Sequence, residues 1–203
     1  MANINLGIPN IFFSGDKHFF HAFMLDKERM TKPRPFADVW QMNSEIVKRH
    51  NEVVQKGDLV YELGDFALKC QPKEARDLRY AMNGNFYFVL GNHDQVAEKI
   101  PDCWVWMKDL VRIKPKGFDC PHITLCHYAM RVWHGSHKGT WQLYGHSHSN
   151  LPEGTQWLSF DVGVDAQNFY PISIEQVIAR MKTKIPAWEK WKSGLGKLGD
   201  VGD

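Results

Sequence analysis

Residues 86–94 read Phe-Tyr-Phe-Val-Leu-Gly-Asn-His-Asp, an apolar run followed directly by residues that bind metal ions. An apolar run of this length, bounded by turn residues, predicts a buried strand. The same order, an apolar run and then metal-binding side chains, recurs in residues 11–18, 59–65, 123–127 and 141–148. Side chains just past such strands meet at one edge of a sheet, where open α/β sheets bind ligands. We therefore expect Asp, Asn and His residues that are far apart in the sequence to converge.

The segments between these strands predict an α/β fold. Residues 36–56 have apolar side chains at helical spacing, and residues 72–82 form a second predicted helix with a proline in its first turn. Helices that alternate with strands predict βαβ units with right-handed crossovers. Further on, the sequence predicts mainly strands, at residues 104–106, 110–114, 121–126, 140–144 and 156–164, and then a final helix over residues 172–181.

The composition predicts a single domain. The chain has 203 residues, of which 43% are hydrophobic and 24% charged, and this balance is ordinary for a globular protein. We assign residues 1–192 to the domain and the Gly-, Asp- and Lys-rich residues 193–203 to a flexible tail. The formal net charge of +2 does not indicate a dedicated nucleic-acid binder.

The expected location is the cytoplasm. No apolar stretch reaches the roughly 20 residues that span a membrane, and no secretory signal is recognisable at the N-terminus. The four cysteines show no CxxC spacing and are expected to be free thiols. A small zinc site made of Cys120, His122 and Cys126 is an alternative use of two of them.

Taken in order, the polar groups resemble a known superfamily. They are Asp16-x-His18, Gly64-Asp65, Gly91-Asn92-His93-Asp94, His127 and Gly145-His146-x-His148. This set, over residues 10–165, resembles the calcineurin-like metallophosphoesterase superfamily. A compact bacterial and phage subgroup is more similar still, through residues 18–21 (His-Phe-Phe-His), 34–36 (Arg-Pro-Phe), 63–66 (Leu-Gly-Asp-Phe) and 161–165 (Asp-Val-Gly-Val-Asp). The resemblance implies a metallophosphoesterase-type β-sandwich of two mixed sheets flanked by helices.

The resemblance also implies a dinuclear metal centre. Asp16, His18 and His148 would hold one ion, and Asn92, His127 and His146 would hold the other. Asp65 would bridge both, and a bridging hydroxide would attack phosphorus. Charge supports a bridge, because two close cations repel each other unless an anion lies between them. We expect two divalent or transition metal ions, with Mn²⁺ favoured and Fe, Zn or Ni as alternatives.

The resemblance makes His93 the catalytic residue that protonates the leaving group or stabilises its charge. Many family phosphatases have an Asp three residues after the bridging Asp, and it orients this His. Leu68 stands at that position here, so His93 must be oriented in another way or act less strongly.

Several other residues have two possible roles. We name His21, Arg34 and Arg131 as possible substrate-binding residues, and His21 could instead pack behind His18. Lys17 could bind phosphate or be a solvated charge, and His134 and His137 could line the substrate pocket or belong to a mobile loop. We assign structural roles to the remaining five. Asp94 bonds backbone amides at a helix start, and Asp161 and Asp165 brace the final strand. Trp133 and Trp141 pack in the core or at its rim rather than stacking on a nucleobase.

The sequence therefore predicts a metal-dependent hydrolase of phosphate esters. Because no cap insertion is evident, we expect an open site that accepts small phosphate-ester or nucleotide-like substrates. Phosphodiesterase activity is slightly favoured, with phosphomonoesterase activity beside it. The alternatives are a nuclease, for which the extra domains are lacking, and a non-catalytic metal-binding scaffold, which would tend to have a broken ligand set. Neither a membrane partner nor an oligomeric state is indicated.

Overall fold

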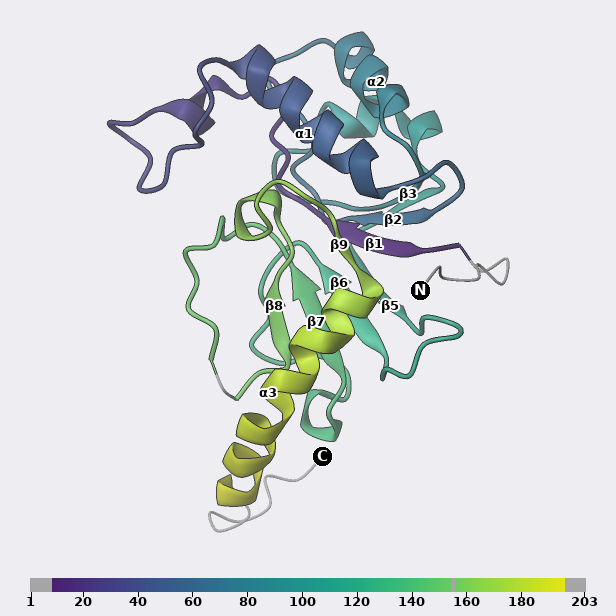
Figure 1. Cartoon of the computed structure of the whole chain (residues 1–203), viewed down its shortest axis with the longest axis vertical. Helices are drawn as coiled ribbons and strands as arrows, with labels where there is room; N and C mark the ends of the chain where they lie inside the picture. The colour runs from purple at the N-terminus through teal and green to yellow at the C-terminus, as the bar shows by residue number, and fades with distance from the viewer. Residues whose placement is uncertain (1–8, 155, 196–203) are drawn as a thin grey trace.

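A computed structural model describes residues 9–154 and 156–195, which form two mixed sheets and three α-helices (Figure 1). The first sheet has the order β4-β3-β2-β1-β9 and the second the order β5-β6-β7-β8. In the first, β9 is the antiparallel edge strand, and in the second it is β5; the other neighbours are parallel. The strands are β1 (Ile11–Ser14), β2 (Leu59–Glu62), β3 (Asn85–Val89), β4 (Trp106–Lys108), β5 (Leu110–Ile113), β6 (Ile123–Cys126), β7 (Trp141–Tyr144), β8 (Ser159–Asp161) and β9 (Ile172–Ser173).

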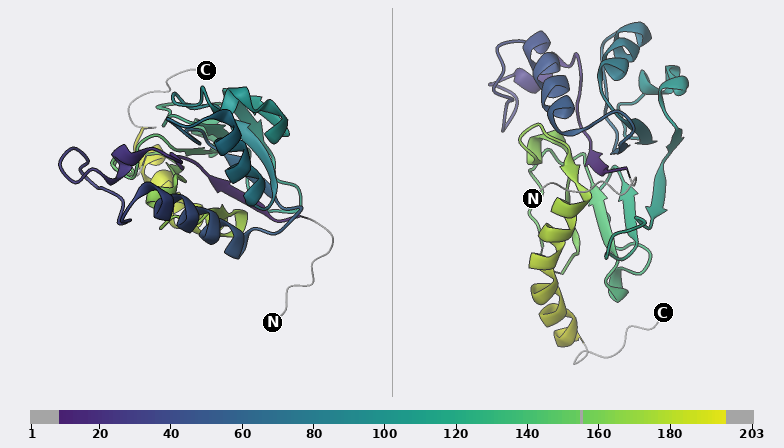
Figure 2. Two further views of the ribbon diagram at one scale, coloured as in Figure 1. Left: turned by 90° about the horizontal axis from the view of Figure 1, so that it is seen from above. Right: turned by 45° about the vertical axis from the view of Figure 1, so that its right-hand side comes forward.

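Two helices cover the outer face of the first sheet, and the third runs along the second sheet (Figures 1 and 2). These are α1 (Val39–Val53), α2 (Pro72–Ala81) and α3 (Ile174–Leu195). Short 3-10 helices occur at η1 (Ala22–Leu25), η2 (Ala97–Lys99), η3 (Pro101–Cys103), η4 (Ser136–Lys138) and η5 (Val164–Ala166). The predicted helix at residues 36–56 is shorter than expected because Asp38 caps its start, accepting a hydrogen bond from the Gln41 backbone N–H at 2.8 Å.

The first sheet is buried on both faces, which explains its unbroken apolar runs. Phe12 belongs to the apolar cluster under α1 and α2, whereas Ile11 and Phe13 belong to a second cluster shared with the other sheet and α3. That second cluster contains Leu125 of β6 and Phe160 of β8, so it joins the two sheets. Successive side chains of β1 therefore serve two different core layers.

Several predicted boundaries are wrong. The strand placed at residues 104–106 is β4, at Trp106–Lys108, because Trp104 is buried in the first cluster with its indole N–H bonded to the Ala97 carbonyl. The predicted last helix begins with a strand, β9, and then continues as α3 through Leu195. Residues 193–195 are thus helical rather than tail, and residues 196–203 lie outside the described part of the chain.

The described residues bear on the predictions for the cysteines, for the alternative zinc site and for membrane-spanning segments. All four cysteines are free, and neither group of possible metal ligands found among the described residues contains Cys120 or Cys126. The alternative zinc site is therefore not formed. No helix in the described ranges has both the length and the apolar character needed to cross a membrane.

His50 gives the fold a testable dependence on pH. It lies in the last turn of α1, and its buried ring stacks on Phe86 and bonds through Nε2 to the Asn83 carbonyl at 2.8 Å. Burial, followed by the positive charge of Lys17, lowers the pKa of His50 to about 3. Because the folded-state pKa lies below the unfolded value of 6.5, the stabilisation is present above that value and is lost as the pH falls toward 3.

We expect the unfolding free energy of the wild type to fall by about 1.4 kcal/mol per pH unit more than that of His50→Gln between about pH 6 and 4. Glutamine remains neutral and can still donate to the Asn83 carbonyl. Urea denaturation at several pH values measures the two slopes. The exposed His122→Gln is the matched control and should keep the wild-type slope; equal slopes for wild type and His50→Gln would contradict the prediction.

Candidate metal centre

The predicted ligands lie just past strand ends of both sheets. The first sheet contributes Asp16 after β1, Asp65 after β2 and Asn92 after β3, and the second contributes His127 after β6 and His146 and His148 after β7. Two groups form: Asp16, His18 and His148, and Asp65, His127 and His146. Within each group one ligand atom per residue lies within 4.8 Å of the others. The sequence prediction that these distant residues converge is confirmed.

The Asp65 carboxylate lies between the two groups. Its Oδ2 is 3.4 Å from His18 Nε2 and 3.6 Å from His127 Nε2. Its Oδ1 accepts a hydrogen bond from the His93 backbone N–H at 2.9 Å, which fixes the carboxylate plane. One anionic group is therefore placed where it can serve a cation on either side.

Hydrogen bonds leave ring nitrogens free for metal binding. His127 Nδ1 lies 2.6 Å from the Leu63 carbonyl and must donate to it, since that oxygen only accepts. The other nitrogen of the neutral ring then carries a lone pair, and it faces Asn92 Oδ1 at 3.2 Å. Two acceptors pointing at each other repel, and a cation between them removes that repulsion.

His18 gives an independent test of whether the residues fit a metal. Both of its ring nitrogens are buried and have no hydrogen-bond partner among the described residues. Burial, followed by the nearby His148, lowers the pKa of His18 well below its ordinary value. The ring is therefore neutral and its lone pair is unused, which is the state that a metal ligand requires.

The backbone at these positions is strained. Positive φ angles occur at Asp16 (54°), His18 (49°), Asp65 (55°), His146 (65°) and His148 (46°). Left-handed backbone is uncommon outside glycine, although Asp, Asn and His tolerate it best. Such strain collects at functional sites, where the surrounding structure holds it in place.

Glycines make room for the candidate ligands. Gly64 has φ +85°, and a Cβ there would lie 2.6 Å from the Gly91 nitrogen. A Cβ on Gly145 would lie 2.6 Å from Asp16 Oδ2. Any larger residue would therefore push the carboxylate away or separate the strand ends.

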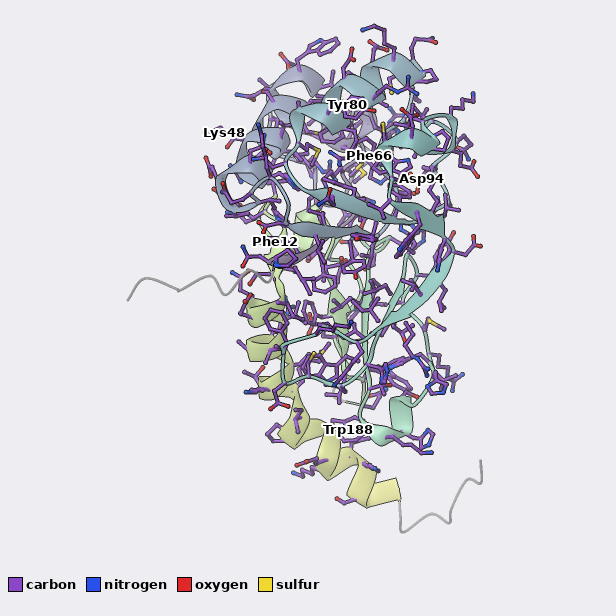
Figure 3. The ribbon with its side chains drawn as sticks, turned by 90° about the vertical axis from the view of Figure 1, so that its right-hand side faces the viewer. Phe12, Lys48, Phe66, Tyr80, Asp94 and Trp188 are labelled. Atoms are coloured by element: carbon purple, nitrogen blue, oxygen red, sulfur yellow. The ribbon has the colours of Figure 1, made fainter. Side chains whose placement is uncertain are left out.

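Asp94 has a structural role, although not at a helix start. It accepts hydrogen bonds from the backbone N–H groups of Asp65, Phe66 and Gly91 at 2.9, 2.9 and 2.6 Å. Its proximity to Phe66 can be followed in Figure 3. Asp94 thus ties the end of β2 to the end of β3 and holds Asp65 in its strained turn.

Asp161 and Asp165 stand behind the histidine ligands. Asp161 Oδ2 accepts from Ser147 Oγ and the Ser149 N–H, which braces the turn that contains His146 and His148. Asp165 Oδ2 accepts from His148 Nδ1 at 2.7 Å and leaves Nε2 of that ring free. The sequence analysis assigned both to bracing the final strand and missed that Asp165 orients the His148 ring.

Arg34 is not a substrate-binding residue. Its side chain is only 2% exposed, and it donates to both Asp165 oxygens at 2.8 Å and to the carbonyls of Asp16 and Lys17. Although burial raises the pKa of Asp165, the charge of Arg34 and the hydrogen bond from His148 outweigh it and hold that pKa far below its usual range. Arg34 therefore keeps Asp165 ionised behind His148.

Lys17 differs from both expected roles, whereas the substrate-binding role of Arg131 stays a prediction. The Lys17 ammonium is 1% exposed and pairs with the buried Glu62 carboxylate and with Ser14 Oγ, so it is neither a phosphate ligand nor a solvated charge. Arg131 is exposed and lines a separate pocket of about 310 Å³ with Leu151 and Trp157. His134 contacts Arg112 and is exposed.

The aromatic residues beside the site separate into two kinds. Trp133 and Trp141 are buried, as predicted, and the Trp133 indole donates to Thr140. Tyr128, which the sequence reasoning missed, is 45% exposed, and its ring packs edge-on against His127 and His146 with centroids 5.0 and 4.8 Å away. Its place directly after His127 was the signal that could have found it.

His93 and His21 lie together on the open side of the centre. The His93 ring is 5.8 Å from the His18 ring and 6.5 Å from the His21 ring, centroid to centroid. No carboxylate within the described ranges bonds to the His93 ring, as the presence of Leu68 led us to expect. His21 is half-buried, 5.5 Å from His18, and lines a pocket with Lys69. It therefore both packs on His18 and faces the pocket.

Comparison with known proteins supports the fold but assigns no activity. No family model matches the chain. The chain is 28% identical over 179 residues to an uncharacterized protein of Methanocaldococcus jannaschii, across 85% of this chain and 92% of that protein. The crystal structure of a protein of unknown function from Aquifex aeolicus matches with a TM-score of 0.66 at 21% identity, across 85% of this chain and 99% of that one. This likeness shows a shared α/β fold.

Asp16→Asn should have opposite effects on stability with and without metal. Burial, followed by the charge of Asp161, raises the pKa of Asp16 well above its ordinary value. The stability from this group is thus fully present below about pH 3.8 and is lost as the pH rises. At about pH 8 the metal-free variant should be more stable than the metal-free wild type by about 1 kcal/mol, and Mn²⁺ should stabilise only the wild type.

Thermal unfolding with and without Mn²⁺ measures both effects. The exposed Asp77→Asn, which removes a carboxylate bonded to Lys73 on α2, should behave as the wild type. A metal-free Asp16→Asn protein that is less stable than the wild type at every pH would contradict the electrostatic argument.

Asp165→Asn should weaken metal binding without removing a ligand. The variant loses the negative charge that orients His148 and balances Arg34, and the loss of such a partner typically costs about 10- to 100-fold in metal affinity. Calorimetric titration with Mn²⁺ measures it. Asp102→Asn removes a carboxylate from a comparable but exposed pair with Arg76 and serves as the control. Unchanged affinity in Asp165→Asn would show that His148 is not a ligand or needs no orientation.

Proposed function

We propose that this protein is a metal-dependent hydrolase of phosphate esters with a dinuclear centre. The observation that carries the proposal is the position of the Asp65 carboxylate, within 3.6 Å of a histidine nitrogen from each of the two ligand groups. A single-ion site has no use for an anion shared in this way, whereas a pair of cations requires one. The order of the motifs, which resembles the calcineurin-like metallophosphoesterases, supports the same reading.

The charge of the ligand set suits a phosphate substrate. Two divalent ions carry four positive charges, and Asp16 and Asp65 remove two of them. Asn92 adds no charge, and burial lowers the pKa of His18 and His146, which favours their neutral form. The centre therefore retains net positive charge, which attracts an anionic ester.

When bound, divalent ions would supply Lewis-acid activation of water and of the phosphoryl oxygens. In the hydrolysis a water oxygen forms a new bond to phosphorus, the ester P–O bond breaks, and a proton ends on the leaving oxygen. We assign that proton transfer to a ring nitrogen of His93, which lies beside His18 on the open side of the centre. Asp65 fixes the His93 backbone by accepting its N–H.

We propose that the two sheets form a metallophosphoesterase-type β-sandwich. The apolar cluster that joins β1 and β3 of one sheet to β6, β7 and β8 of the other supports this description. It brings the ligand-bearing ends of both sheets to one place.

We propose small phosphodiesters as the main substrates, with phosphomonoesters beside them. The exposure of Asn92 and His146 supports an open site. A nuclease is the second candidate, and the exposed Tyr128 ring beside His146, on which a base can stack, is the feature in its favour. A non-catalytic scaffold is less favoured, because all seven predicted ligands are retained and no part of the set is broken.

The test is hydrolysis of bis-p-nitrophenyl phosphate and p-nitrophenyl phosphate with added Mn²⁺. We expect turnover by the wild type and a loss of about 100-fold or more in Asp65→Asn and His93→Ala. The ratio of the two substrates decides between diesterase and monoesterase, and Asp77→Asn is the control variant. If the protein binds Mn²⁺, Ni²⁺, Zn²⁺ or iron and turns over neither ester with any of them, the scaffold becomes the better description.

A further inference from the structure

A pocket of about 450 Å³ opens directly beside the candidate centre, on the side of His21 and His93. It is lined by His21, Ala22, Phe23, Leu25, Asp26, Arg29 and Lys69. If His93 delivers a proton to the leaving oxygen, the leaving group must lie on this side. The inference that follows rests on the proposed function, and the chemistry of this pocket then decides which leaving groups fit.

The pocket has one uncompensated positive charge. Arg29 is neutralised, because its Nε bonds to the Asp26 carboxylate at 2.5 Å and its guanidinium lies over the Phe23 ring. Lys69 makes no ion pair with any residue in ranges 9–154 and 156–195. Because the charges of Arg29 and Asp26 cancel each other, the charge of Lys69 gives the pocket a net charge of about +1.

The backbone at Lys69 is held in a fixed conformation. Its φ is +55°, an uncommon conformation for a lysine. The preceding segment is fixed against the His18–His21 turn, where Phe19 pairs with Ala67 and the Leu68 N–H bonds to the Phe19 carbonyl at 3.0 Å. The fold thus directs a lysine to the wall next to His21 at the cost of backbone strain, as functional sites often do.

The other wall of the pocket is apolar. Phe23 stacks against His21 with centroids 5.8 Å apart, and Ala22 and Leu25 continue the lining. An aromatic or sugar-like group can pack on this wall while a negative group attached to it reaches Lys69.

We propose that the pocket selects phosphate esters whose leaving group carries a second anionic group, either a carboxylate or another phosphate. The anion contacts Lys69, and the body of the leaving group packs on Phe23. Such a substrate is held at both ends, by the metal centre and by the lysine.

Three aryl esters of the same shape test the proposal: phenyl phosphate, 4-carboxyphenyl phosphate and 1,4-phenylene bisphosphate, each followed by phosphate release with added Mn²⁺. We expect the wild type to prefer the two doubly anionic esters over phenyl phosphate. Comparison of 4-carboxyphenyl phosphate with 1,4-phenylene bisphosphate shows whether a carboxylate or a phosphate is the better second anionic group. The measured quantity is the ratio of kcat/KM for each doubly anionic ester to that for phenyl phosphate.

Variants then assign the preference to the pocket. Lys69→Ala should lower the ratio about tenfold, as expected for a lost charged hydrogen bond, Lys69→Glu should lower it further, and Lys69→Arg should restore most of it. Asp26→Asn, which releases Arg29, should raise it. The exposed Lys182→Ala on α3 is the matched control and should leave the ratio unchanged.

The failures of the two proposals differ. Turnover of all three esters with the same ratio in wild type, Lys69→Ala and Lys69→Glu would overturn the selectivity inference and leave the hydrolase standing. If the metal-loaded protein hydrolyses bis-p-nitrophenyl phosphate but none of the three esters, the selectivity inference alone is overturned. If it hydrolyses neither bis-p-nitrophenyl phosphate nor any of the three esters, the hydrolase proposal and this inference both fail.

Discussion

Buried negative charge at the strand ends is the constraint on which the rest of the site depends. Asp16 is fully buried near Asp65, Asp161 and Asp165, and their mutual repulsion adds to the cost of removing them from water. The His146 backbone N–H, which donates to the Asp16 carboxylate, and Arg34, which pairs with Asp165, reduce that cost, yet the pKa of Asp16 remains raised. A cation at this position would remove the remaining repulsion, so the arrangement sacrifices stability in the metal-free protein for affinity.

The site exists only because two sheets pack together. The first sheet supplies the carboxylates and Asn92, whereas the second supplies His127, His146 and His148. Each sheet alone would present only part of each ligand group at an exposed edge. The shared apolar cluster, with Phe13 from one sheet and Phe160 from the other, therefore sets the distance between ligands as well as the stability of the fold. Metal binding and the association of the sheets should accordingly reinforce each other.

Most cations around the centre support the fold. Lys17 pairs with Glu62 in the core, and Arg34 pairs with Asp165 behind His148. Both are buried, where removing one partner would leave an uncompensated charge. Lys69 differs because it stands exposed and unpaired among the described residues, next to His21. Substrate recognition by positive charge is thus expected from the metal ions and from the pocket beside them.

The sequence by itself determined the elements that carry the candidate ligands and most of the residues that converge at the candidate centre. Apolar runs such as residues 86–90 are long enough to predict strands, and Gly-Asp or Gly-Asn at their ends predicts polar turns. It could not tell which way neighbouring side chains point: Asp16 and His18 belong to one ligand group, but Lys17 between them pairs with Glu62 in the core. The partnership of Arg34 with Asp165, 131 positions apart, and the pocket that places Lys69 beside His21 depend on long-range packing. Only the tertiary structure decided these contacts, because no local pattern encodes a distance between segments that meet only after folding.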